Sequence, residues 1–167
     1  MRSLQAEIRR REPSRRERRA WISPPEGLRR TLAAHLGFDA YEIVVVPAPA
    51  RDDTGRPTTA GRRAARAFTA RAAAAARATG RPALVAVHRG RHWVAVFGLA
   101  PDGRSVTVLD PTGPARRTTV RWGRWLPNYL TPVTPAPGRP TAAAGGWVAL
   151  VPTPVRGAMG GPRPASA

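Results

Sequence analysis

The sequence predicts an α+β domain in which one or two N-terminal helices pack on a small antiparallel β-sheet. Two helical patterns and several short β-branched runs lie between residues 21 and 152. Two of these runs are separated only by Pro101-Asp102-Gly103, which favours a tight hairpin. The 167 residues suffice for one such domain. We expect a basic flexible arm over 1–20, the folded domain over 21–152 and a Pro/Gly-rich tail over 153–167.

The first helix is expected after Ser23, because a serine followed by two prolines and Glu26 is typical of a capped helix start. Leucines at every fourth position then share one face, and Gly37 ends the helix. The alanine-rich run 60–79 predicts the second helix, which ends at Gly80. One face of this second helix carries Arg62, Arg63, Arg66 and Arg77.

Strands are predicted for the β-branched and aromatic runs, over residues 41–47, 82–88, 92–100, 105–111 and 145–152. The segment between the last two runs is rich in tryptophan, and residues 122–130 are expected to form a short helical turn or a loop. No internal repeat is found.

The formal net charge is +18, and all 28 basic residues are arginines. Such a charge predicts attraction to polyanions such as nucleic acid. The chain has no cysteine, which excludes disulfides, thiolate metal sites and thiol nucleophiles within it. The N-terminal 20 residues lack the apolar stretch of a secretory signal, and no apolar run is long enough to cross a membrane. We therefore expect a soluble, cytoplasmic protein.

His92 and Asp110 are the candidate site residues, because the hairpin is expected to bring them together. In an antiparallel hairpin the numbers of paired residues have a constant sum, and a turn at 101–103 sets that sum near 204. His92 then lies within two positions of Asp110 on the same sheet face. A carboxylate behind an imidazole orients the ring and stabilises its protonated form.

The segment GRHWVAVFGLAPDGRSVTVLDPTG resembles the catalytic hairpin of papain-like cysteine peptidases, and is most similar to bacteriocin (double-glycine) leader peptidases. The order of elements over about residues 20–152 is similar as well. The resemblance implies a papain-like fold, with His92 as base and Asp110 as orienting residue.

The chain departs from that family at the nucleophile. The resemblance places Ile22 where the family has its cysteine, and Arg15 and Arg16 near the position of its oxyanion-hole glutamine. Ser23 could replace the thiol only if it pointed at His92, and the sequence favours it as a helix cap. The His92–Asp110 pair is then either a remnant of catalysis or a structural pair.

The favoured interpretation is a degenerate, non-catalytic papain-like domain that binds a peptide or protein segment. One alternative is a hydrolase that uses Ser23 with His92 and Asp110. The other is a basic nucleic-acid-binding module, in which aromatic residues beside arginines could stack on bases, namely Trp93, Trp122, Trp125 and Tyr129. No cofactor is expected, and the three histidines show no metal-ligand spacing. The residues expected to contact a polyanion are Arg62, Arg63, Arg66, Arg116, Arg117 and Arg121.

Overall fold

The structure is a computed structural model that describes residues 24–37, 39–48, 57–113, 116–134 and 144–154. Its helical elements are α2 (Pro25–Leu36), α3 (Thr59–Thr79), η2 (His88–Gly90), α4 (Trp122–Arg124) and η3 (Trp125–Tyr129). Its strands are β1 (Tyr41–Pro47), β2 (Ala83–Val87), β3 (His92–Leu99), β4 (Ser105–Leu109), β5 (Thr118–Arg121) and β6 (Gly146–Pro152).

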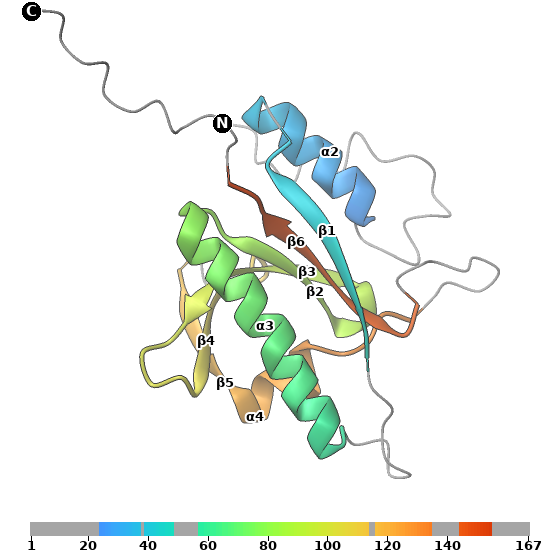
Figure 1. The fold of residues 1–167 in the computed structure, drawn as a ribbon, viewed down its shortest axis with the longest axis vertical. Helices are drawn as coiled ribbons and strands as arrows, with labels where there is room; N and C mark the ends of the chain where they lie inside the picture. Colours follow the sequence, from blue (N-terminus) through green and yellow to red (C-terminus); the bar gives the residue numbers. More distant parts are fainter. Residues whose placement is uncertain (1–23, 38, 49–56, 114–115, 135–143, 155–167) are drawn as a thin grey trace, which may run out of the picture.

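The six strands form one open sheet in the order β1-β6-β2-β3-β4-β5, and every neighbouring pair is antiparallel. Figure 1 shows the last strand, β6, between β1 and β2. The predicted α+β class is therefore confirmed. The predicted strands 41–47 and 145–152 agree closely with β1 and β6, which pair with each other along their whole length.

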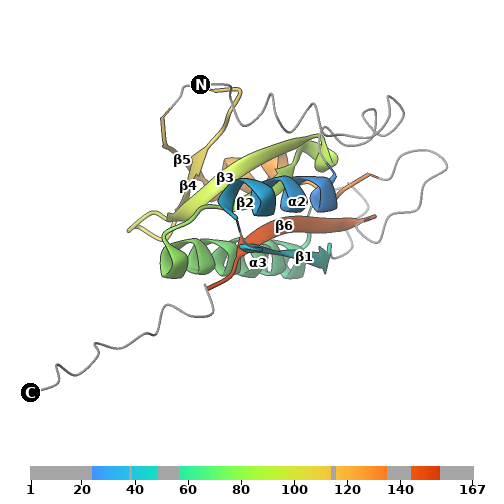
Figure 2. The same cartoon turned by 90° about the horizontal axis from the view of Figure 1, so that it is seen from above.

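The two longer helices cover opposite faces of this sheet, as Figure 2 shows. Phe68 and Ala72 of α3 pack in the main core against alternate residues of the central strands, among them Val94. Leu28 and Leu32 of α2 pack on the other face, in a smaller cluster. That cluster also contains Tyr41, Ala40 and Leu150, with Ile43, Leu84 and Trp93 at its margin.

The start of α2 differs from the expectation. Pro24 occupies the N-cap position and Pro25 begins the helix, so the prediction of Ser23 as the N-cap is wrong by one position. Among the described residues, no side-chain hydrogen bond caps this end. The expected capping box of Ser23 with Glu26 stays a prediction. Ser23 itself lies outside the described residues. The predicted end is confirmed, since Gly37 has φ 78°, a conformation that glycine adopts without a steric penalty.

Helix α3 matches the prediction within one residue and has a cap that was not predicted. The Thr58 hydroxyl accepts a hydrogen bond from the Gly61 N–H at 3.1 Å. Phe68, Ala72 and Ala76 face the core, while the arginines predicted for the opposite face are exposed. Alanine at most core positions lets α3 lie close against the sheet.

The β3–β4 hairpin has the predicted register at its open end. Ala95 pairs with Leu109 and Val96 with Val108, and in both pairs the two residue numbers add up to the predicted 204. An irregularity between Val96 and Gly98 shifts the register by one residue nearer the turn. This shift leaves the end that carries His92 and Asp110 unaffected.

None of the helices in the described ranges is long and apolar enough to cross a membrane.

Candidate functional site

His92 and Asp110 form a hydrogen-bonded pair at the open end of the β3–β4 hairpin. His92 Nε2 lies 2.7 Å from Asp110 Oδ1, which confirms the predicted contact. The side chains are only 17% and 21% exposed, so the pair is sheltered but can still be reached from solvent. His92 shares a sheet face with Val94, which places the pair at the margin of the core under α3.

Asp110 is held as an anion by hydrogen-bond donors. Its Oδ1 accepts from the Thr112 N–H at 2.9 Å and from the Thr112 hydroxyl at 2.7 Å, as well as from His92. Burial by itself would raise the pKa of Asp110, but the Thr112 hydrogen bonds and the interaction with His92 together outweigh it and hold that pKa below its usual value.

An ionised carboxylate only accepts hydrogen bonds, so His92 Nε2 must carry the proton of the contact. The tautomer is thereby assigned from its partner. His92 Nδ1 makes no hydrogen bond to any of the described residues. Neutral His92 therefore presents an acceptor at Nδ1, and protonated His92 presents a donor there.

The β2–β3 connection positions a second imidazole beside this pair. His88, Arg89 and Gly90 all have positive φ, at 52°, 64° and 81°. For the two non-glycine residues this left-handed conformation costs about 1–2 kcal/mol each. The turn is held by hydrogen bonds from the Arg89 N–H to the Thr131 hydroxyl at 2.7 Å and from the Thr134 N–H to the Arg89 carbonyl at 3.3 Å.

This strained turn places His88 in a row of four rings, here called the ring row: His92, His88, Tyr129 and Trp125. Neighbouring centroids are 6.2 Å, 5.3 Å and 5.5 Å apart along the row. Trp125 is fully buried, and its Nε1–H donates to the hydroxyl of buried Thr69 at 3.1 Å. The row thus runs from the core under α3 out to the exposed His88 and the sheltered His92.

The described part of α2 does not contact this site, because it packs on the opposite face of the sheet. Its axis runs antiparallel to β1 in Figure 1, so its first turn points towards the end of the sheet where β3 begins. Ile22 and Ser23 lie outside the described residues. The placement of Ile22 beside His92, and any role for Ser23, stay predictions.

The six arginines proposed for polyanion contact all have exposed side chains. They lie on two elements: Arg62, Arg63 and Arg66 on α3, and Arg116, Arg117 and Arg121 on β5 and just before it. Arg62 donates to the Pro57 carbonyl at 2.6 Å and to the Thr59 hydroxyl at 2.9 Å, so its guanidinium is already engaged at the start of α3.

Sequence reasoning did not link three residues of the site to His92 and Asp110: His88, Thr112 and Tyr129. Thr112 could have been found, because an aspartate often accepts from the N–H two residues later. His88 reaches the site only through its left-handed backbone, which no pattern in the sequence indicates. Tyr129 reaches it through the π-helical turn η3, within a segment for which the sequence predicted only a turn or a loop.

The ranges that the structure describes contain no group of three or more His, Asp or Glu side chains arranged to hold a metal ion. Comparisons with protein-family models, with curated proteins and with solved structures find no match to the chain.

The lowered pKa of Asp110 predicts a pH-dependent contribution to stability. A carboxylate with a lowered folded pKa stabilises the fold above its unfolded pKa of about 3.9, and this contribution is lost as the pH falls through the lower folded pKa. Asp110→Asn should therefore reduce the free energy of unfolding more at pH 7 than at pH 3, as measured by urea titration.

Thr112→Val serves as a partial control for Asp110→Asn, because it removes the hydroxyl donor and keeps the backbone N–H. The ¹³C shift of the Asp110 carboxyl should then titrate at a higher pH than in the wild type. An unchanged titration would show that Thr112 does not stabilise the anion.

Proposed function

We propose that the protein is a degenerate papain-like domain, related to leader peptidases, that binds a peptide or protein segment without cleaving it. The observation that supports this most is the His92–Asp110 contact of 2.7 Å in a chain without cysteine. The pair has the geometry of a base and its orienting carboxylate. A thiol for it to activate is missing from the chain.

A nucleophile within reach of His92 would distinguish cleavage from binding. General-base activation needs a hydroxyl or thiol within about 2.6–3.2 Å of the imidazole nitrogen. Among the described residues, none makes a hydrogen bond with His92 Nδ1. In the proposed complex this nitrogen accepts a hydrogen bond from a ligand N–H group, such as a peptide amide.

The ring row supplies the apolar part of the same proposed site. His88 is exposed and Tyr129 is half-buried, and the two rings lie side by side at 5.3 Å. The two ring planes are inclined at 38°, and exposed ring faces of this kind suit an aromatic or aliphatic side chain of the ligand. The proposed ligand is therefore an extended segment with an apolar side chain next to an amide donated to His92.

Peptide display on the full-length protein tests this proposal. A random 12-residue library should yield peptides enriched on the wild type that bind His92→Ala and Tyr129→Ala at least about tenfold more weakly, the loss expected of an anchor worth about 1.4 kcal/mol. Trp93→Ala is a matched control, because Trp93 lies on the opposite sheet face. Equal binding to all variants would overturn the proposal, as would cleavage of the peptide or labelling of Ser23 by a serine-directed probe.

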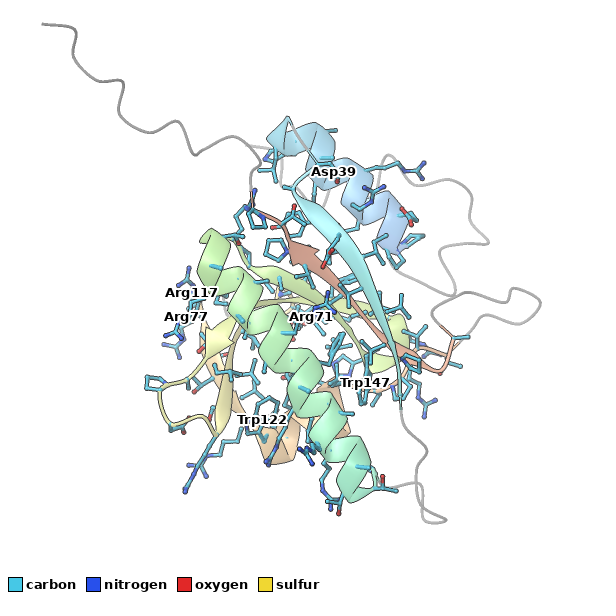
Figure 3. All side chains as sticks on the ribbon, in the orientation of Figure 1. Asp39, Arg71, Arg77, Arg117, Trp122 and Trp147 are labelled. Atoms are coloured by element: carbon cyan, nitrogen blue, oxygen red, sulfur yellow. The ribbon has the colours of Figure 1, made fainter. Side chains whose placement is uncertain are left out.

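A second candidate function, binding of nucleic acid, is favoured by the separation of charges on the surface. Three acids, Glu26, Asp39 and Glu42, line one groove beside α2. Figure 3 shows Asp39 at the other end of the molecule from Trp122. The Arg66 guanidinium lies 5.7 Å from the Trp122 ring centroid. The Arg117 guanidinium, just before β5, lies 3.8 Å from the Phe97 ring centroid.

Binding to duplex DNA should accordingly weaken with salt, with a slope in log K against log salt of about −0.9 for each phosphate neutralised. Arg121→Gln should make the slope less steep by about 0.9, the contribution of one phosphate contact. Arg30→Gln, which removes the same charge from α2, should leave the slope unchanged. Fluorescence anisotropy from 0.05 to 0.2 M salt would measure both slopes. Affinity that is independent of salt would exclude this candidate.

A further inference from the structure

An open groove of about 380 Å³ lies between α2 and the first residues of β1. It is far from the proposed peptide site and is unusual for this protein, because its rim is acidic while the chain carries a net charge of +18. The groove is lined by Glu26 and Arg29 of α2, by Asp39, Tyr41, Glu42 and Ile43, and by Thr153.

One wall of the groove is the outer edge of the sheet. β1 pairs only with β6 among the described strands. The Ala40 carbonyl accepts from the Thr153 N–H at 2.9 Å, and the Ala48 N–H donates to the Gly145 carbonyl at 3.1 Å. In this register the backbone N–H and C=O groups of the even-numbered residues of β1 are directed towards β6. The alternation of an antiparallel ladder directs the N–H and C=O groups of Tyr41, Ile43 and Val45 to the outer edge. This edge can accept an added extended segment.

The carboxylates of the groove already accept guanidinium groups. Arg29 lies 2.5 Å from Asp39 and 3.5 Å from Glu26, and Arg71 lies 3.2 Å from Glu42. The Arg71–Glu42 pair is exposed, with side-chain accessibilities of 60% and 49%. Exposed pairs of this kind contribute at most about 1 kcal/mol, so another arginine can replace the present partner.

The sequence that precedes the groove supplies such arginines. Residues 1–20 contain eight arginines, and this arm joins the domain at Pro24, two residues before Glu26 of the groove. Arg18 and Arg19 are five or six residues from Pro24, which is a reach of about 17–20 Å for an extended chain. A covalent connection of this length gives an effective concentration in the millimolar range.

We propose that the arginine-rich arm, residues 1–20, docks in cis along the outer edge of β1, with its guanidinium groups on Glu26, Asp39 and Glu42. Charge complementarity and the short connection favour this occupant over a separate basic peptide. The inference does not depend on the function proposed for His92, which lies on another strand. Docking would also withhold these arginines from a polyanion.

Trypsin tests the proposal on the full chain, because it cuts after arginine. Cleavage within residues 9–19 should be slow in the wild type, and it should be roughly tenfold faster in the triple variant Glu26→Gln/Asp39→Asn/Glu42→Gln, since each exposed pair contributes a small part of the protection. High salt should produce the same increase by screening. Intact-mass spectrometry measures the rates, and circular dichroism checks that the variant is folded.

Two single variants serve as controls. Asp102→Asn removes one carboxylate from the β3–β4 turn and should not alter cleavage of the arm. Arg71→Gln breaks the Arg71–Glu42 pair but keeps the carboxylate, so the arm should stay protected. Equal cleavage rates in the wild type and the triple variant would overturn the proposal. So would protection that rises with protein concentration together with a dimer in sedimentation, since the arm would then bind a second copy.

Discussion

Replacing Trp125 with alanine is expected to reduce the free energy of unfolding by about 3–5 kcal/mol, the range for deleting a buried aromatic side chain. Trp125 is fully buried in the main core and contacts elements far apart in the chain. Its ring stacks on Tyr129, and its indole N–H donates to Thr69 on α3. The substitution would remove the inner end of the ring row. Guanidinium unfolding of the full-length protein measures the loss.

Trp125→Phe separates the two parts of this effect, because it keeps an aromatic ring and removes the N–H donor. Trp125→Phe should reduce the free energy of unfolding by less, namely by about 0.5–1.5 kcal/mol for the lost hydrogen bond and by a further, smaller amount for the lost packing. Trp93→Ala is a useful comparison, since Trp93 is only partly buried on the other face. A loss below about 1 kcal/mol for Trp125→Ala would contradict the described packing.

A cysteine introduced at position 22 should react unusually fast with alkylating agents. If Ile22 occupies the nucleophile position of the papain-like family, Ile22→Cys places a thiol beside His92 and near the start of α2. Both an imidazolium and a helix N-terminus lower a thiol pKa. We expect alkylation at neutral pH to be roughly tenfold faster than for an exposed control cysteine, since a thiol pKa lowered by one unit or more greatly increases its thiolate fraction.

His92→Ala in the Ile22→Cys background should return the alkylation rate to the control value. Peptidase activity is not expected to return, because an oxyanion donor also contributes roughly 10²–10³ in rate and arginines stand near its position in the family. Ordinary reactivity that is indifferent to His92 would show that residues 21–24 do not match the family's nucleophile helix. The contact of His92 with Asp110 would be unaffected by that result.

The sequence was sufficient for most elements with a strong local signal. Alanine content and a terminal glycine located α3, and β-branched runs located β1, β2, β3, β4 and β6 within about two residues. β5 was not predicted, because Thr118–Arg121 is short and has only Val120 buried. The order of the strands was not predicted either, since the β1–β6 pairing joins segments about 100 residues apart and depends on packing across the whole sheet.

The candidate site was predictable to the extent that it depends on hairpin register. Both residue numbers are even, as is the sum of the paired residue numbers in the hairpin, and this predicted His92 and Asp110 on one sheet face. The structure confirms their contact. The ring row was not predictable, because it requires left-handed residues at His88 and Arg89 and a π-helical turn at Trp125–Tyr129. These conformations are set by tertiary contacts such as the Arg89–Thr131 hydrogen bond.

The imidazole ¹⁵N spectrum of His92 in the full-length protein, recorded with and without a display-selected peptide, tests the central claim most directly. In the neutral imidazole of the free protein, Nε2 should carry the proton and Nδ1 should not, because ionised Asp110 accepts from Nε2. Peptide binding should move the Nδ1 resonance and leave Nε2 protonated, with amide shifts at Thr112 and Tyr129. His92 resonances that stay unchanged at saturation, while amides elsewhere shift, would contradict a peptide site at the His92–Asp110 pair.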